Sequence, residues 1–312
     1  MKDQVFTIHS VNISEKKGTV KNPVAEIQLL DEGISGDAHS GKWHRQISLL
    51  GIESVKKFSE MAKREIQFGE FAENITTEGV TLYEMKPLDR LTIGEVVLEV
   101  TQIGKKCHGD KCAIYREVGN CVMPKEGIFC RVLKHGTLKA GMSGVYKHRI
   151  LKTLVLTLSD RASTGEYSDR SGPKLVELLN SHIEGLGYQH ENHYAIIPDE
   201  KPELMKLLKR HYDEGVDFIF TTGGTGIAER DITPDVVAGW IDKEIPGIME
   251  MIRTKYGASK PSVLLSRSIA GVRGNTCVYT LPGSVRAVEE YCNEIFPLLH
   301  HSLLMLNSID AH

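Results

Sequence analysis

The chain has 312 residues, of which 41% are hydrophobic and 25% are charged, and its formal net charge is −3. This length predicts about two domains, and the composition is typical of a soluble globular protein with a sizeable core. The charge balance argues against a nucleic-acid or membrane-surface binder. No apolar run is long enough to span a bilayer, and the first ten residues lack the apolar segment of a signal peptide, so we expect a cytoplasmic protein.

The first half, residues 1–142, is predicted to be a mainly-β domain. Stretches rich in Val, Ile, Leu and Thr, with turn residues between them, fall at 5–13, 24–30, 74–77 and 90–100. Residues 48–65 carry apolar side chains at helical spacing and predict the one clear helix of this half. We expect a closed or partly closed β-barrel, followed by a short linker over 143–149.

The second half, residues 150–312, alternates strands and helices. Strands are expected at 151–158, 194–197, 218–221 and 276–281. Helices are expected at 173–183, 202–214, 234–256 and 285–295, with a further C-terminal helix from Pro297. This rhythm predicts an α/β domain, with a mainly parallel sheet covered by helices on both faces. Ligands in such sheets bind at the carboxyl ends of the strands.

A glycine-rich loop over 221–235 directly follows the apolar run 216–220. Gly223, Gly224 and Gly226 allow the backbone to turn tightly and to approach a ligand closely. The loop has no Gly-Lys-Ser/Thr sequence, so it is not a P-loop, and it lacks the glycine spacing of a dinucleotide-binding turn. Taken alone, a glycine-rich loop after a strand is as often only a turn.

The end of this loop carries a helix start and a carboxylate. Thr233 and Pro234 predict a helix with Thr as its N-cap and Pro at its first position. A strand, a glycine-rich loop and a helix in succession direct backbone N–H groups towards one point and favour an anion there. Asp231 would hold a divalent cation against phosphate oxygens.

Three further loops follow predicted strands and carry polar groups. They contain Asp160 with Ser163, then Asp199, and then Gly283 with Ser284. Each has an ordinary structural interpretation, since Asp and Ser residues commonly cap turns and helices. Because the carboxyl ends of parallel strands meet at one edge of the sheet, we expect all four loops to converge.

The motifs of the second half together resemble the MogA/MoaB family, whose active members are molybdopterin adenylyltransferases. The resemblance covers 150–305 and rests on the segments 158–163, 197–199, 221–235, 264–271 and 281–283. It implies attack by the terminal phosphate of molybdopterin on the α-phosphate of ATP, with pyrophosphate as the leaving group and no pyridoxal phosphate. The family also suggests a homotrimer.

The resemblance implies roles for individual residues. Asp199 and Asp231 match the two essential aspartates of the family and would hold Mg²⁺. The residues implied in substrate binding are Asp160, Ser163, Gly223, Gly224, Thr225, Gly226, Arg230, Ser266, Gly283 and Ser284. Within this set, backbone N–H groups of 223–226 would bind the pterin-side phosphate. Family members often carry Asn where this chain has Thr280, and some are suspected of binding pterin without catalysis.

The first half resembles a MOSC domain over roughly 5–142. The segments that carry the resemblance are 36–39, 43–46, 70–74 and 102–108. It implies cofactor binding by Asp37, His39, Arg45 and Asn74. The functional cysteine of the family falls on Cys107 and is linked to sulfur handling or to direct ligation of a molybdenum or tungsten cofactor.

Cys107 follows Lys105 and Lys106, and cationic neighbours lower a thiol pKa and favour the reactive thiolate. An inert buried thiol is the ordinary alternative. Cys107, Cys112, Cys121 and Cys130, with His108 nearby, also offer ligands for zinc or an iron–sulfur cluster. They lack the paired short spacings of most zinc sites, so we expect no stoichiometric metal in this half.

The combined prediction is a bifunctional protein of molybdenum-cofactor synthesis. Its second half would activate molybdopterin with ATP and Mg²⁺, and its first half would bind the pterin or finished cofactor and carry sulfur. Its partners would be the small substrates and a molybdenum-insertion protein or molybdoenzyme acceptor. Two alternatives remain open, namely a cofactor carrier without turnover and a metal-bound regulatory module in the first half.

Overall fold

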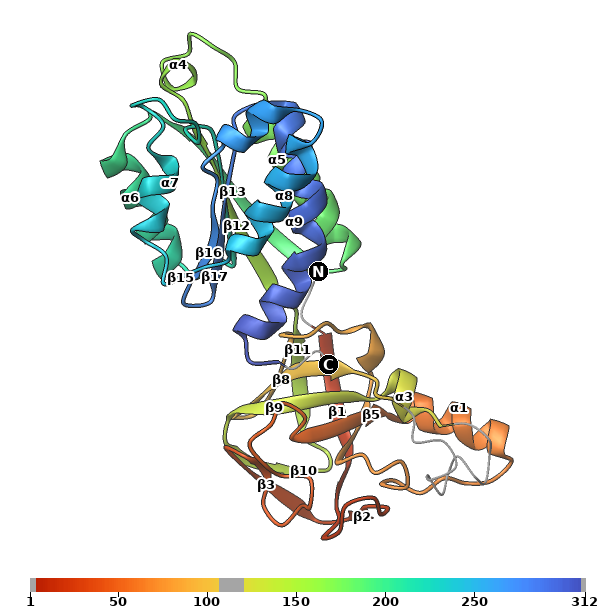
Figure 1. Cartoon of the computed structure of the whole chain (residues 1–312). Coiled ribbons are helices and arrows are strands. Elements are labelled where there is room, and N and C mark those ends of the chain that lie inside the picture. The colour runs from red at the N-terminus through yellow and green to blue at the C-terminus, as the bar shows by residue number, and fades with distance from the viewer. Residues whose placement is uncertain (1–3, 107–120, 310–312) are drawn as a thin grey trace. The chain divides into compact units, whose positions relative to one another are not determined.

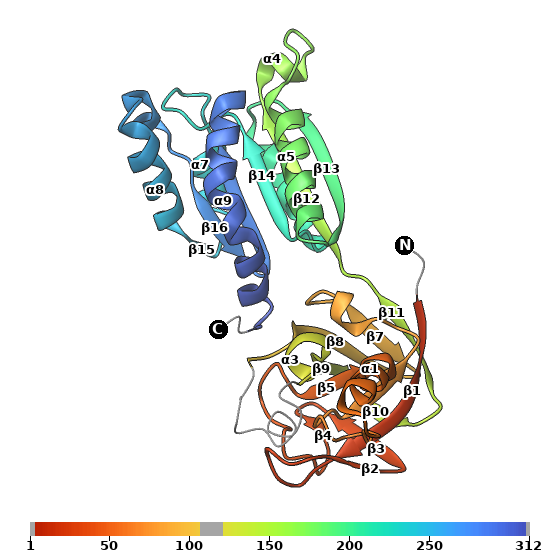
Figure 2. The ribbon, with the colours of Figure 1, turned by 90° about the vertical axis from the view of Figure 1, so that its right-hand side faces the viewer.

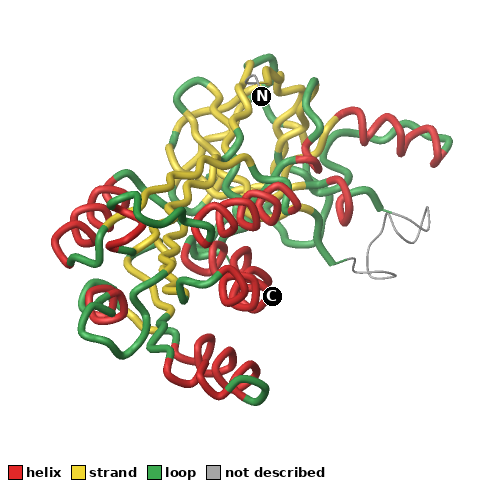
Figure 3. Tube along the Cα trace, turned by 90° about the horizontal axis from the view of Figure 1, so that it is seen from above, coloured by secondary structure: helices red, strands yellow, loops and turns green. Residues whose placement is uncertain are grey.

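The computed structural model describes residues 4–106 and 121–309. The chain divides into two compact units, Met1–Arg149 and Ile150–His312 (Figure 1). The first unit is rich in strands, and the second combines strands with helices (Figure 3).

The first unit contains a barrel that, in the described residues, closes through seven strands in the order β11-β7-β8-β9-β5-β6-β1, with β11 paired back to β1. These strands are β1 (Gln4–Ile13), β5 (Ile47–Gly51), β6 (Ile75–Glu78), β7 (Arg90–Ile93), β8 (Val96–Ile103), β9 (Ile128–Lys134) and β11 (Ser143–Lys147). A smaller sheet contains β3 (Glu26–Leu30), β4 (Gly33–Ile34) and β10 (Gly136–Lys139), and β2 (Asn22–Pro23) pairs with β1. The predicted barrel is confirmed.

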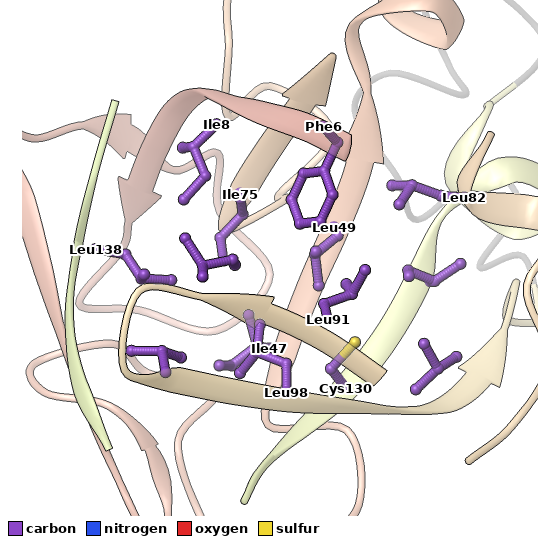
Figure 4. Close-up of a cluster of buried hydrophobic side chains, with 14 of the residues drawn as sticks. Phe6, Ile8, Ile47, Leu49, Ile75, Leu82, Leu91, Leu98, Cys130 and Leu138 are labelled. Atoms are coloured by element: carbon purple, nitrogen blue, oxygen red, sulfur yellow. The ribbon is translucent and has the colours of Figure 1, made fainter. Parts of the chain in front are cut away.

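The barrel core explains the strand pattern. Phe6 and Ile8 of β1 point inward with Leu49, Ile75 and other apolar side chains from the neighbouring strands (Figure 4). Helices α1 (Ile52–Ala62), α3 (Met123–Glu126) and the 3-10 turn η1 (Leu82–Glu84) lie outside the barrel strands. The helix expected from residue 48 starts at Ile52, because 48–51 pair within β5.

The expected linker is shorter than predicted. Ser143–Lys147 forms β11, which pairs with both β1 and β7 and closes the barrel. A run with Gly141 and Gly144 looked like a connector, but Gly144 lies against the Phe6 ring, where a side chain would not fit. Only 148–149 therefore separate β11 from the first strand of the second unit.

The second unit is built on a six-stranded sheet, counted over its described residues, in the order β13-β12-β14-β17-β16-β15. The strands are β12 (Ile150–Leu158), β13 (Gln189–Ile197), β14 (Phe218–Thr222), β15 (Lys243–Glu244), β16 (Ala270–Arg273) and β17 (Thr276–Leu281). β12, β13, β14 and β17 are parallel, and β16 runs antiparallel to both of its neighbours, β17 and β15. This confirms the predicted α/β architecture, with β15 and β16 as strands that the prediction missed.

Helices cover both faces of this sheet (Figures 1 and 2). They are α4 (Asp160–Ser163), α5 (Ser171–Gly185), α6 (Lys201–Asp213), α7 (Thr233–Ala238), α8 (Pro246–Gly257), α9 (Val285–Leu306) and the 3-10 turn η3 (Pro261–Leu265). α6 and α7 lie on one face, and α5, α8 and α9 on the other. The two C-terminal helices expected around Pro297 are one continuous helix, α9.

Candidate functional site

The register of the parallel strands aligns their carboxyl ends at one edge of the sheet. Leu158 pairs with Ile197, and Thr222 pairs with Leu281. The loops that follow these four residues carry the predicted polar groups, so the expected convergence follows directly from the strand pairing.

Asp160 and Asp199 tie two of these loops together. The Asp160 N–H donates to Asp199 Oδ2 at 3.1 Å, and the Asp199 N–H donates to Asp160 Oδ1 at 3.0 Å. Neither aspartate is the N-cap of the helix beside it, since Ser159 caps α4 and Glu200 precedes α6. The capping interpretation of these two aspartates is therefore wrong.

Arg230 neutralises one of the two carboxylates. Its Nε lies 2.9 Å from Asp160 Oδ2, and its Nη2 lies 2.6 Å from both carboxylate oxygens. The hydrogen bonds from Arg230 lower the pKa of Asp160 below its ordinary value. Arg230 thus reaches from the glycine-rich loop to the loop after β12, and both residues belong to the set predicted from sequence.

Asp199 keeps one oxygen for a ligand. Its Oδ1 is buried and accepts no hydrogen bond from the described residues. Partial burial and the charges of Asp160 and Asp231 raise the pKa of Asp199. Gly224, at φ +60°, lies against this oxygen, and a Cβ there would come within 3.0 Å of it. An unpaired buried carboxylate oxygen beside further negative charge fits a divalent cation.

Asp231 is the second predicted magnesium ligand. Its Oδ2 accepts the Ala228 N–H at 2.8 Å, and its negative charge contributes to the raised pKa of Asp199. Among the described residues, no three His, Cys, Asp or Glu side chains gather into a metal site. A cation here would therefore be held by Asp199 and Asp231 together with oxygens of the substrate or water.

The glycine-rich loop presents consecutive backbone donors. The N–H groups of Gly224, Thr225 and Gly226 have no acceptor within the described parts of the chain. Gly223 differs from the prediction, because its N–H donates to the Leu281 carbonyl at 2.9 Å. Gly223 has a structural role, since at φ +101° a Cβ would lie 2.2 Å from the Leu158 carbonyl oxygen. The anion-binding interpretation thus applies to 224–226.

Arg267 and Thr233, neither of which was predicted to bind substrate, hold this loop in place. The Arg267 Nε donates to the Gly226 carbonyl at 2.7 Å, and its Nη2 donates to the Asp231 carbonyl. Its guanidinium also pairs with Asp235 of α7 at 2.9 Å. Thr233, expected to be the N-cap of α7, is its first residue, and its Oγ1 donates to the Gly223 carbonyl. Arg267 lies in the segment 264–271, which is one of those that carry the family resemblance, so the sequence did point to this region.

The remaining predicted residues have mainly structural contacts. Ser284 caps α9 by accepting the Ala287 N–H, and Ser163 donates to the Asp160 carbonyl within α4. Ser266 Oγ lies 2.9 Å from Ser268 Oγ and 3.2 Å from the Tyr291 hydroxyl. Gly283 lies against Gly223, where a Cβ would come within 3.3 Å of the Gly223 Cα.

Asp169 is a further polar centre that the prediction did not single out. Its Oδ2 accepts the Thr157 hydroxyl at 2.6 Å and the Tyr194 hydroxyl at 2.5 Å. Its Oδ1 accepts the N–H and hydroxyl of Ser171 at the start of α5. These bonds anchor the 164–170 loop to the sheet. The polar character of 159–172 is visible in the sequence, but its internal contacts depend on the fold.

The first unit gathers a second set of predicted residues around Asp37. Asp37 is buried, and its Oδ2 accepts hydrogen bonds from Lys21 Nζ at 2.5 Å and from Asn74 Nδ2 at 3.1 Å. Its Oδ1 accepts the His39 N–H at 2.9 Å. Burial acts to raise the pKa of Asp37, but the hydrogen bonds from His39 and Lys21 outweigh it and lower the pKa. Three of the four predicted residues are thus in one network.

The fourth, Arg45, lines a small pocket with two residues of that network. Its lining residues are His39, Trp43, Arg45, Ser48, Ala72, Asn74, Lys105, Met123 and Phe129. The Arg45 guanidinium lies 4.8 Å from the centre of the Trp43 ring. Two cations, Arg45 and Lys105, therefore face a pocket whose wall also contains aromatic rings.

Each of the two units matches the model of a known protein family. Residues 154–301 match the model of a probable molybdopterin binding domain, and residues 36–143 match the MOSC domain model. The second half is 38% identical over 146 residues to molybdopterin adenylyltransferase of Helicobacter pylori, which is 46% of this chain and 81% of that protein.

The chain belongs to the molybdopterin adenylyltransferase family. Within this family it is also 38% identical over 173 residues to the Pyrococcus furiosus enzyme, covering 51% of this chain and 98% of that protein. It is 35% identical to a molybdenum cofactor biosynthesis bifunctional protein of Chlorobaculum tepidum, of which it covers 50%, and 34% identical to Dictyostelium discoideum gephyrin, of which it covers 22%.

The crystal structure of MoaB from Thermus thermophilus is 36% identical, with a TM-score of 0.46, and covers 50% of this chain and 96% of that one. Thr280 is buried. Its Oγ1 accepts the Ile269 N–H at 2.8 Å, so this position ties β17 to the segment before β16. None of the helices in the described residues is long and apolar enough to cross a membrane.

The cysteines of the described residues are mostly buried. Cys107 and Cys112 lie outside the described residues. Cys130 is fully buried in the barrel core, and burial raises its pKa (Figure 4). A four-cysteine metal site would need Cys130 as a ligand, and its place among apolar side chains argues against that site. Burial also raises the pKa of Cys277 to about 11 and of Cys292 to about 12.

Proposed function

We propose that the second half transfers the adenylyl group of ATP to the terminal phosphate of molybdopterin. A phosphate oxygen of molybdopterin forms a bond to the α-phosphorus of ATP, and the bond to pyrophosphate breaks. The proposal depends on one observation. Asp199 Oδ1 and the backbone N–H groups of 224–226 lie in loops at the same edge of the sheet, and neither has a hydrogen-bond partner among the described residues. Such a transfer needs positioning and charge neutralisation more than covalent chemistry from the protein.

The residues would divide this work as follows. Backbone N–H groups of 224–226 would bind the pterin-side phosphate, and Asp160 would orient substrate while paired to Arg230. Asp199 and Asp231 would hold Mg²⁺, which supplies charge neutralisation at the phosphates. Ser163, Ser266, Gly283 and Ser284 would shape the nucleotide side, where Ser266 Oγ has Tyr291 as its neighbour.

Pyrophosphate release tests this activity. The full chain, supplied with ATP, molybdopterin and Mg²⁺, should release pyrophosphate and form adenylylated molybdopterin in equal amounts. Tight molybdopterin binding without pyrophosphate would instead identify a carrier protein. Omitting Mg²⁺ should stop turnover and leave molybdopterin binding measurable, which separates the two outcomes.

We infer that the first half binds pterin or the finished molybdenum or tungsten cofactor. His39, Arg45 and Asn74 would line its pocket, Asp37 would hold His39 and Asn74, and Cys107 would be the reactive thiol. The buried state of Cys130, Cys277 and Cys292 supports Cys107 over these three. Competitive alkylation should label Cys107 first. If Cys107→Ser leaves both persulfide formation and cofactor binding unchanged, the assignment is wrong, with Cys112→Ser as the matched control.

We also propose that units 1–149 and 150–312 are the two functional domains. The resemblance of the chain to its family supports a cytoplasmic homotrimer that delivers its product to a molybdenum-insertion protein or molybdoenzyme. Light scattering of the purified chain tests the trimer. Co-purification with a molybdoenzyme tests the delivery.

A further inference from the structure

Lys21 is an unusual residue beneath the pocket of the first unit. Its side chain is 1% exposed, as is that of its partner Asp37. Its Nζ lies 2.5 Å from Asp37 Oδ2 and 3.3 Å from His39 Nδ1. Burial lowers the pKa of Lys21, and the hydrogen bond and charge of Asp37 oppose that effect. A buried ammonium paired with a carboxylate therefore faces one nitrogen of the His39 ring.

This contact decides where the imidazole proton lies. An ammonium group has only donors, so the nitrogen that faces it must act as an acceptor. In neutral imidazole, one nitrogen accepts and the other carries the proton, so His39 carries it on Nε2. Asp37 Oδ1 competes for the opposite tautomer, but it lies 3.5 Å from Nδ1 and already accepts the His39 backbone N–H. Of the two contacts to Nδ1, the one to Lys21 Nζ is the shorter, and it favours the Nε2–H tautomer.

We propose that Lys21 is a positioning residue that holds His39 as an Nε2–H donor towards the pocket. His39 lines that pocket, and its Nε2 has no hydrogen-bond partner in the described chain. The ligand must then present an acceptor oxygen or sulfur to His39, and the ring is unavailable as a metal ligand. Arg45 and Lys105 on the same pocket favour an anionic acceptor such as a phosphate.

The other charged groups near Lys21 agree with this assignment. Asp37 and, when it is ionised, Glu73 raise the pKa of Lys21, and Lys105 lowers it. The Asp37 carboxylate favours the ammonium form of Lys21 against burial, which preserves the donor that His39 Nδ1 needs. The identity of the ligand rests on the cofactor-binding function proposed for this unit, whereas the tautomer does not.

Long-range ¹H–¹⁵N NMR of the full chain with ¹⁵N-labelled histidine tests the proposal directly. His39→Gln assigns the His39 signals. Above the pKa of the ring, the wild type should show the Nε2–H tautomer. Lys21→Met should shift the tautomer ratio by about tenfold or more, because a hydrogen bond to a charged group has about that effect. Lys105→Met, which removes a cation from the same pocket without contacting Nδ1, should leave the ratio unchanged.

The wild-type spectrum alone decides the matter if Lys21→Met fails to fold. An Nδ1–H tautomer in the wild type, or an unchanged ratio in folded Lys21→Met, overturns the proposal. So does one equivalent of Zn²⁺ that shifts the His39 Nε2 signal as a bound ligand. If the Nε2–H tautomer is found but the chain binds neither molybdopterin nor finished cofactor at this pocket, the cofactor-binding function fails while the role of Lys21 stands.

Discussion

Asp160 and Asp199 each accept a hydrogen bond from the other residue's backbone N–H, at 3.0 and 3.1 Å. This reciprocal pair fixes the loops after β12 and β13 relative to each other. Arg230 then pairs with Asp160 and leaves Asp199 Oδ1 unpaired and buried. Two aspartates in adjacent loops thus have different environments, one paired with a guanidinium and the other with a buried, unpaired oxygen.

Asp199→Asn should remove turnover and spare the fold. The raised pKa of Asp199 shows that its surroundings disfavour the charge, so an amide costs little stability. Loss of the charge beside the metal should lower kcat by about a hundredfold or more. Asp231→Asn should behave likewise. Pyrophosphate release measures the rate, thermal unfolding measures the fold, and the exposed Asp213→Asn is the control; full activity in Asp199→Asn would remove it from the metal site.

The second unit was largely predictable because its strands are covered on both faces. β12 is an almost continuous apolar run, and the polar groups of the site sit in the loops directly after such runs. The role of Arg267 was not predictable, since its partners Gly226, Asp231 and Asp235 come from segments far away in the sequence. β16, with the sequence AGVR, was missed because its glycine and arginine interrupt an apolar strand pattern.

In the first unit, the sequence identified Asp37, His39 and Asn74 as candidate site residues, but it did not identify Lys21 or Glu73. Lysine and glutamate are ordinarily exposed, and only the closure of the barrel and its loops buries these two. The linker was mistaken for the same reason, since a strand that closes a barrel depends on partners distant in the sequence. The pairing of 143–146 with residues 4–7 of β1 is such a case.

Arg267→Lys should loosen the glycine-rich loop. Lysine keeps the positive charge but cannot reach the Gly226 carbonyl, the Asp231 carbonyl and Asp235 together. We expect KM for molybdopterin to rise about tenfold, with a smaller change in kcat. The loss of one hydrogen bond to a charged group changes an equilibrium constant by about that factor. Arg286→Lys, in an exposed pair with Glu290, is the control. Equal KM values in both variants would show that the loop needs no brace.

Gly223→Ala should be strongly destabilising. Its methyl group would lie 2.2 Å from the Leu158 carbonyl oxygen, in addition to the strain of φ +101°. Gly165→Ala separates the two effects, because Gly165 has φ +80° with nothing within 4 Å. Strain alone should cost about 1–2 kcal/mol at Gly165, and the added clash should bring Gly223→Ala to about 3 kcal/mol or more. Chemical unfolding of the second unit, followed by Trp240 fluorescence in a Trp43→Phe background, measures both; similar losses would mean that the loop relaxes around the methyl group.

Glu73 should make the first unit less stable as the pH rises. Its side chain is buried, its Oε2 has no hydrogen-bond partner among the described residues, and burial raises its pKa from 4.5 to about 7. Between these two values the folded state holds a proton that the unfolded state has released, so the free energy of unfolding falls as pH rises. The fall should total about 3 kcal/mol and level off above about pH 7.

Glu73→Gln should abolish this slope. The amide oxygen can still accept the Gly69 N–H and the Thr76 hydroxyl, which bond Oε1 in the wild type, but the side chain no longer titrates. The two tryptophans of the chain are Trp43 and Trp240, so in a Trp240→Phe background the fluorescence of Trp43 reports the first unit alone. Urea unfolding between about pH 5 and about pH 8 gives the slope for the wild type, for Glu73→Gln and for the exposed control Glu60→Gln. If the wild type and Glu73→Gln lose stability in parallel across this range, Glu73 is ionised in the folded barrel and another group sets the pH dependence.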